Sequence, residues 1–154
     1  MATTDNDNLI STLNTLIQTC KDGAEGFREA AQGVNSSDLR DLFTRYSQQR
    51  AQFTTELQDE VRKLGSEPET SGSIAASLHR SWINIREALQ GNDESAVLNE
   101  CERGEDAAVD SYQDALKQAL PSDVMSIVER QYMQIREAHD RIKSLRNVSN
   151  AAAS

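Results

Sequence analysis

Four long stretches of this chain carry apolar residues at steps of three and four, which is the spacing of one face of an α-helix. They cover about residues 6–32, 37–64, 94–119 and 121–147. With only 2 Pro, 7 Gly and 5% aromatic residues in 154, the chain is poor in turn-forming and strand-forming residues. The pattern predicts an all-α fold with four helices of about 26 residues, each roughly 39 Å long.

The connections between these stretches predict how the helices are paired. Gly33, Asn35 and Ser36 provide a stop and a new N-cap, so the first two helices are expected to be antiparallel. About residues 66–93 separate the second helix from the third, which is too long for a hairpin and long enough to return along the bundle. This favours two antiparallel hairpins joined by a crossover, as in ferritin-like bundles, over a simple up-down-up-down bundle.

The crossover is expected to be partly helical. A loop rich in Ser, Glu, Pro and Gly is followed by an amphipathic segment at about residues 73–89. Its apolar face is expected to pack on the bundle or to form an interface. The residues proposed for this contact are Ile74, Leu78 and Trp82.

Charge and composition restrict the class of partner. With 16 basic and 25 acidic side chains the net charge is −9, which argues against nucleic-acid binding. No apolar run approaches the roughly 20 residues that a membrane span needs, and 2 Cys do not make a disulfide framework. MATTDNDN has no features of a signal peptide, so a cytoplasmic location is expected. The chain is expected to form one domain over residues 1–154, with frayed tails at about 1–5 and 148–154.

Ferritin-like bundles hold two iron ions at mid-height with inward carboxylates and Glu-x-x-His pairs, so the midpoints of the helices are the place to look for a site. Three residues before His79 stands Ala76, and three before His139 stands Arg136, so the chain contains no Glu-x-x-His. The usual set of six ligands cannot be assembled. The candidate residues on the inward stripes near mid-height are Cys20, Arg50, Glu105 and His139.

Three stretches carry a resemblance to a known family: residues 20–31 (CKDGAEGFREAA), 102–106 (ERGED) and 131–140. Together with the order of the helices they resemble a family of bacterial ferritin-like bundles that is catalogued as a domain of unknown function. The resemblance covers nearly the whole chain and implies a loose association with bacterial stress responses. It assigns no chemistry to any residue.

Comparison with rubrerythrin-type members of the wider superfamily implies where ligands would stand. Gly104-Glu105 with Tyr112 resembles their ligand motif on the third helix, and His139 falls where the histidine of the fourth helix would be. The other ligand positions differ. By this resemblance Cys20 replaces the carboxylate of the first helix, Arg50 and Phe53 replace the pair of the second, and Arg136 replaces the glutamate of the fourth.

These replacements favour a bundle that has lost its metal site. A carboxylate left in the core without a cation costs several kcal/mol, and arginine is an internal substitute for that cation. We therefore expect Arg50, together with Arg136, to pair with Glu105. The protein is then expected to be non-catalytic, to need no cofactor and to act through protein contacts, those of a homodimer among them. The alternative is a reduced iron site for oxidase or storage chemistry that uses Glu105 and His139 with help from Glu102.

Overall fold

The computed structural model describes residues 2–68, 82 and 84–153, and every regular element in this part of the chain is a helix. This confirms the all-α class. Four of the helices are long and one is a short helix that precedes the third long one. Their bounds are α1 Ala2–Gly33, α2 Ser37–Lys63, α4 Ile85–Gln90, α5 Glu94–Leu116 and α6 Ser122–Ala153.

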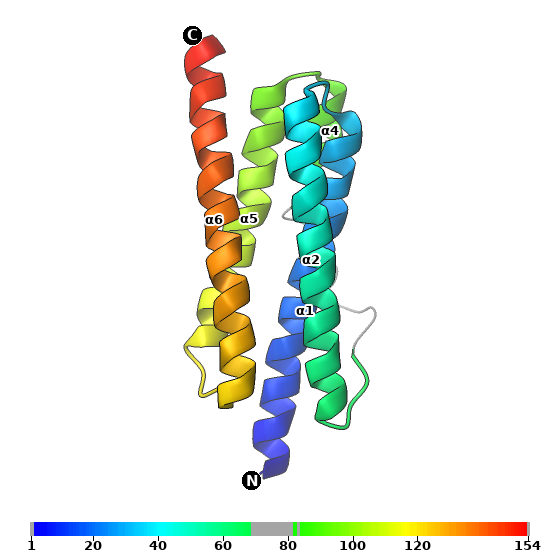
Figure 1. Ribbon diagram of the computed structural model, residues 1–154, viewed down its shortest axis with the longest axis vertical. Coiled ribbons are helices and arrows are strands. Elements are labelled where there is room, and N and C mark those ends of the chain that lie inside the picture. The colour runs from blue at the N-terminus through cyan, green and yellow to red at the C-terminus, as the bar shows by residue number, and fades with distance from the viewer. Residues whose placement is uncertain (1, 69–81, 83, 154) are drawn as a thin grey trace.

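The long helices form two antiparallel hairpins, α1–α2 and α5–α6 (Figure 1). In that view α1 and α6 run upward while α2 and α5 both run downward, which excludes the simple up-down-up-down arrangement. The turn before α2 and the turn before α5 therefore lie at the same end of the bundle, where Asn35 Nδ2 donates a hydrogen bond to Asn92 Oδ1 at 2.8 Å. Helix α2 ends at the opposite end of the bundle from α4, and we call the chain between these two helices the crossover (Figure 1).

The interior contains two apolar clusters. One, toward the N-terminal half of α1, includes Leu13, Phe53 and Ile135, and the other includes Phe27, Phe43 and Ile142. Arg50 of α2 falls in sequence between Phe43 and Phe53, so the junction of the two clusters is where a charged residue enters the core.

Three of the helix boundaries follow from capping and turn residues that can be recognised in the sequence. The Ser36 side chain accepts a hydrogen bond from the backbone N–H of Leu39, which is an N-cap. Gly65 has φ +83°, the left-handed conformation that ends α2. Pro121 stands immediately before α6 and its carbonyl accepts the first helical hydrogen bond, from Met125 N–H at 2.8 Å.

The outer helix ends extend further than expected. α1 begins at Ala2, and α6 continues to Ala153, so the tail expected to fray after about residue 147 is helical. No glycine or proline interrupts residues 122–153, and Ser95 Oγ of α5 donates a hydrogen bond to Asn150 Oδ1, which ties the last turns of α6 to the bundle.

Trp82 of the crossover is buried, with 4% of its surface exposed, and packs edge-on against Phe27 with 5.0 Å between the ring centroids. The other two residues expected to pack from the crossover, Ile74 and Leu78, lie outside the described residues. None of the helices that the structure describes combines the length and apolar character needed to cross a membrane.

Candidate functional site

Arg50 and Glu105 form an ion pair at the centre of the bundle. Arg50 lies midway along α2 and Glu105 midway along α5. Nη1 and Nη2 of the guanidinium donate to Oε1 and Oε2 of the carboxylate at 2.5 and 2.6 Å. The side chains are 1% and 0% exposed. Two parallel charge-assisted bonds are the strongest arrangement available to this pair of groups, and here they replace water completely.

The facing surface of α1 is shaped to receive the arginine. A Cβ on Gly23 would lie 3.4 Å from Nη1 and 3.5 Å from Cγ of Arg50, so the backbone of α1 passes close beside this side chain. Phe27 places its ring centroid 5.4 Å from Cζ of Arg50, within cation–π distance. Nε of Arg50 donates to Oε1 of Gln49 at 3.3 Å. Side chains and backbone of α1, α2 and α5 thus fix the guanidinium together.

The charge on this arginine is permanent. Burial lowers the pKa of Arg50, but the charge and the hydrogen bonds of Glu105 act in the opposite direction and the net pKa is raised. The two charges depend on each other, because removing one partner of a buried pair leaves the other without solvent or counter-charge. The pair is therefore a fixed structural feature rather than a proton-transfer site.

A second polar chain runs from the core to the surface and uses all four long helices. Cys20 Sγ lies 3.1 Å from Tyr112 Oη, and Tyr112 donates to Oε1 of Gln131 at 2.7 Å. Gln131 Nε2 donates to Glu56 Oε1 at 3.1 Å, and Arg130 Nη2 donates to Glu56 Oε2 at 2.6 Å. This chain of hydrogen bonds was not predicted from the sequence. Its signal was Gln131, a polar residue on an otherwise apolar inward stripe.

The thiols and the phenol of this region are poor nucleophiles. Burial raises the pKa of Cys20 to about 11, against smaller opposing effects of the Tyr112 hydrogen bond and the Arg50 charge. Burial also raises the pKa of Tyr112 and of Cys101 well above their ordinary values. Both cysteines are buried and free. Since the thiolate is the reactive form of cysteine, these thiols are inert at neutral pH.

His139 does not face the ion pair. Its Nε2 lies 2.6 Å from Asp106 Oδ1 and its Nδ1 lies 3.1 Å from Asp140 Oδ1, and the ring is 16% exposed. Burial lowers the pKa of His139, but the hydrogen bonds with Asp140 and Asp106 outweigh it, so the net pKa is raised. The histidine belongs to a boundary cluster between α5 and α6.

The three residues of the alternative iron site are not brought together either. Glu102 accepts a hydrogen bond from Nη1 of Arg146, Glu105 is held by Arg50, and His139 is held by Asp106. Each carboxylate thus already faces a cationic group. Among the residues that the structure describes, no group of three or more His, Cys, Asp or Glu side chains is placed to hold a metal ion.

The expectation that Arg136 joins the buried cluster is wrong. Arg136 is exposed, and Nη1 donates to the Tyr132 hydroxyl of its own helix at 3.2 Å. The inward face of α6 is set by Ile135, Ala138 and Ile142. A helix turns about 100° per residue, so Arg136 is carried away from that face when Ile135 occupies it.

Fold and site together define an all-α bundle whose interior is crossed by a buried arginine–glutamate pair. Residues 8–118 match the family described as a domain of unknown function (DUF2383), and the chain belongs to that family. Helix α6 lies beyond the matched residues. A comparison with curated proteins finds no match.

Proposed function

We propose that this protein is a non-catalytic ferritin-like bundle in which the Arg50–Glu105 pair occupies the position of a lost metal site, and that it acts through contacts of its surface with other proteins. The observation that carries the proposal is the complete burial of this pair at mid-height of the bundle. The proposed setting is the bacterial cytoplasm, in a stress-related role and without nucleic acid or membrane as a partner.

The path of the chain supports the ferritin-like comparison. The helices form two antiparallel hairpins, α1–α2 and α5–α6, and α2 and α5 run in the same direction (Figure 1). In bundles of this class, inward side chains of the four long helices supply the metal ligands. Arg50 and Glu105 come from two of the corresponding helices and lie near their midpoints.

Charge supports the absence of metal chemistry at this position. The guanidinium of Arg50 is a fixed positive charge in a medium of low dielectric constant, so it repels any cation that enters the same space. Both carboxylate oxygens of Glu105 are already engaged by Arg50. A metal ion would have to displace the arginine from both of these oxygens.

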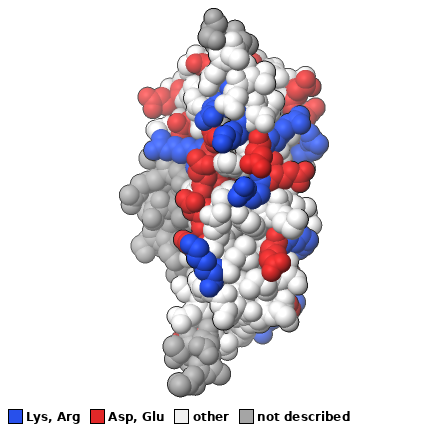
Figure 2. Space-filling view, turned by 90° about the vertical axis from the view of Figure 1, so that its left-hand side faces the viewer, with Lys and Arg blue, Asp and Glu red and all other residues white. Residues whose placement is uncertain are grey.

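The outer surface is a mixture of both signs of charge. Figure 2 shows Lys and Arg side chains interspersed with Asp and Glu on the face that it presents, most densely over its upper half. Among the described residues, the only large hydrophobic side chains that are exposed are Met133 and Val148. Such a surface favours polar, reversible contacts over an obligate apolar interface. Light scattering on the purified chain will decide whether a homodimer is one of these contacts.

Metal analysis is the experiment that tests the proposal. Untagged protein, purified without chelator from iron-rich medium, is measured by elemental mass spectrometry and melted with and without ferrous ion. We expect no stoichiometric iron and an unchanged melting temperature. Near-stoichiometric iron that raises the melting temperature, and that Glu105→Gln abolishes, would overturn it in favour of an iron site.

A further inference from the structure

A groove follows the seam between α2 and α6. Its wider part is a hollow of about 710 Å³ that both helices line, and a second hollow of about 370 Å³ adjoins it. The two hollows share Arg45, Gln49 and Gln134, so they form one continuous depression, which we call the α2–α6 groove. A space of this size matches the volumes of ordinary small-molecule sites.

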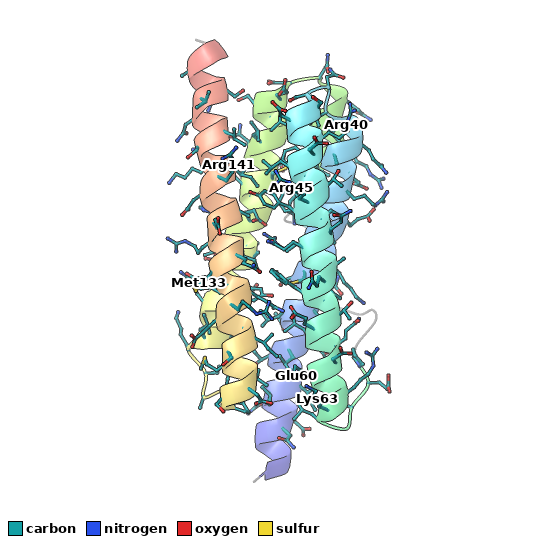
Figure 3. The ribbon with its side chains drawn as sticks, in the orientation of Figure 1. Arg40, Arg45, Glu60, Lys63, Met133 and Arg141 are labelled. Carbon is teal, nitrogen blue, oxygen red and sulfur yellow. The ribbon has the colours of Figure 1, made fainter. Side chains whose placement is uncertain are left out.

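Two arginines from opposite walls of the groove form no ion pair with any residue that the structure describes. Arg45 lines it from α2 and Arg141 lines it from α6, at a similar height in the bundle (Figure 3). Within the described residues neither forms a salt bridge or a hydrogen bond, whereas Arg130 at the lower end is paired with Glu56. In a protein of net charge −9, two unpaired guanidinium groups facing one hollow are a local excess of positive charge.

Two further residues that line the wider hollow carry hydrogen-bond donors. Oε1 of Gln49 accepts from Nε of Arg50, which leaves the amino group of Gln49 free to donate. The half-buried Tyr46 packs its ring on Phe27, with 5.3 Å between centroids, and its hydroxyl has no hydrogen-bond partner among the residues described. Burial raises the pKa of Tyr46, so this hydroxyl is a donor at neutral pH.

The remaining lining residues define what kind of molecule fits. Leu42 and Ala138 are buried apolar side chains, Gln134 offers an amide, and Glu137 is the acidic residue of the wider hollow. Two arginines against one glutamate leave this hollow with a positive balance. Its donors, amides and small apolar side chains suit a compact molecule that carries an acid group and hydroxyls.

We propose that the α2–α6 groove binds a small organic anion, a hydroxylated phosphate or carboxylate, whose acid group is held between Arg45 and Arg141. Guanidinium groups bind both acids through paired hydrogen bonds, so phosphate and carboxylate are one recognition chemistry here. The inference goes beyond the proposed function and does not depend on it, because neither Arg50 nor Glu105 lines the groove.

Calorimetric titration of the full chain tests the proposal. The probes are a hexose phosphate, citrate and inorganic phosphate, with the free hexose as the neutral control, all at physiological salt. We expect saturable binding of the hexose phosphate or of citrate and none of the free hexose, and the better of the two identifies the acid. No saturable binding of any anion up to about 10 mM would overturn the proposal.

Variants locate the site. Arg45→Gln/Arg141→Gln is expected to weaken binding by about tenfold or more, because each guanidinium supplies charge-assisted hydrogen bonds. The matched control is Arg40→Gln/Arg136→Gln, which removes the same charge from two exposed arginines that do not line the hollows. It should bind like the wild type. Equal weakening in both double variants would show a general ionic effect only and would overturn the proposal.

A third variant is expected to bind the probe more tightly, a result that a misfolded protein would not give. Glu137→Gln removes the carboxylate that opposes an anion in the wider hollow. We expect it to bind the preferred probe severalfold more tightly than the wild type does. Unchanged or weaker binding in this variant would place the anion elsewhere on the molecule.

Discussion

The indole of Trp82 lies directly against the backbone of Gly104, so closely that a Cβ at this position would be 2.2 Å from Cε2 of the ring. Gly26 of α1 also contacts the indole, since a Cβ on this residue would lie 2.2 Å from Cε3 of the ring. The two glycines form a slot on α1 and α5 that fits the indole. Because Gly104 precedes Glu105, Trp82 packs beside the residue that carries the acidic half of the buried ion pair.

Replacing either glycine of the slot should displace the crossover. Gly104→Ala or Gly26→Ala introduces a methyl group into space that the indole fills, and overpacking of this kind costs about 1–3 kcal/mol. Since Trp82 is the only tryptophan of the chain, its fluorescence reports the displacement as a shift to longer wavelength. Urea denaturation measures the loss of stability.

Gly91→Ala is the matched control for these two variants. Its Cβ would meet only the carbonyl oxygens of Ala88 and Glu87, at 3.6 and 4.0 Å, and its φ of −73° suits any residue. Fluorescence and stability of this variant should stay close to the wild type. A Gly104→Ala protein that behaves like Gly91→Ala would show that the indole does not sit in the slot.

Helical spacing was enough to predict the four long helices and to place Arg50 and Glu105 at the same depth, because both residues sit on apolar stripes. The same spacing did not predict that the side chain of Arg136 is exposed. Arg136 directly follows Ile135, and on a helix a shift of one position decides between core and solvent.

The slot for Trp82 could not be read from spacing, because only the packed structure shows which glycines the indole covers. A signal was present nonetheless. Glycine inside a helix is less favourable than alanine by about 1 kcal/mol, so Gly26 and Gly104 in mid-helix indicated close packing. The α2–α6 groove has no comparable signal in the amino-acid pattern, because its arginines look like any solvent-exposed charge.

Removing one partner of the buried pair should be far more damaging than removing both. Arg50→Met leaves the carboxylate of Glu105 buried without a counter-charge, and Glu105→Gln does the same to the guanidinium, at a cost of about 3–5 kcal/mol each. The double variant Arg50→Met/Glu105→Leu fills similar volume with apolar groups and should recover most of that loss. Urea denaturation of the four proteins gives the comparison.

An exposed ion pair provides the control for this comparison of stabilities. Arg62 and Asp59 are 50% and 59% exposed and 3.3 Å apart, and exposed pairs of this kind contribute little. Arg62→Met should leave the stability unchanged within error. If Arg50→Met is as harmless as Arg62→Met, the guanidinium is not buried against Glu105 in solution.

The stability should depend on pH through His139. Its pKa in the folded state is raised above the ordinary 6.5 by Asp140 and Asp106, against the lowering effect of burial. The protonated ring therefore stabilises the fold. This contribution is complete below about pH 6.5 and is lost as pH rises through the folded pKa.

The difference in stability between wild type and His139→Gln should accordingly be larger at about pH 5.5 than at about pH 8.5. NMR titration gives the pKa directly, with His79→Gln used to assign the signals. Asp106→Asn removes one of the raising partners and should lower the pKa of His139. A titration midpoint below 6.5 in the wild type would contradict the hydrogen bonds with both aspartates.

Finally, the cysteines should resist modification while the protein is folded. Burial raises the pKa of Cys20 to about 11, and Cys101 is completely buried with a pKa raised well above its ordinary value. A disulfide-exchange reagent at about pH 8 therefore meets neither an accessible sulfur nor a thiolate. In denaturant the same reagent should titrate both thiols of the chain at once.

The rate of thiol modification in the absence of denaturant then measures how often the bundle opens. Gly104→Ala, which displaces Trp82, should increase this rate. Rapid modification of the folded wild type would show that the core around Cys20 and Tyr112 is open to solvent.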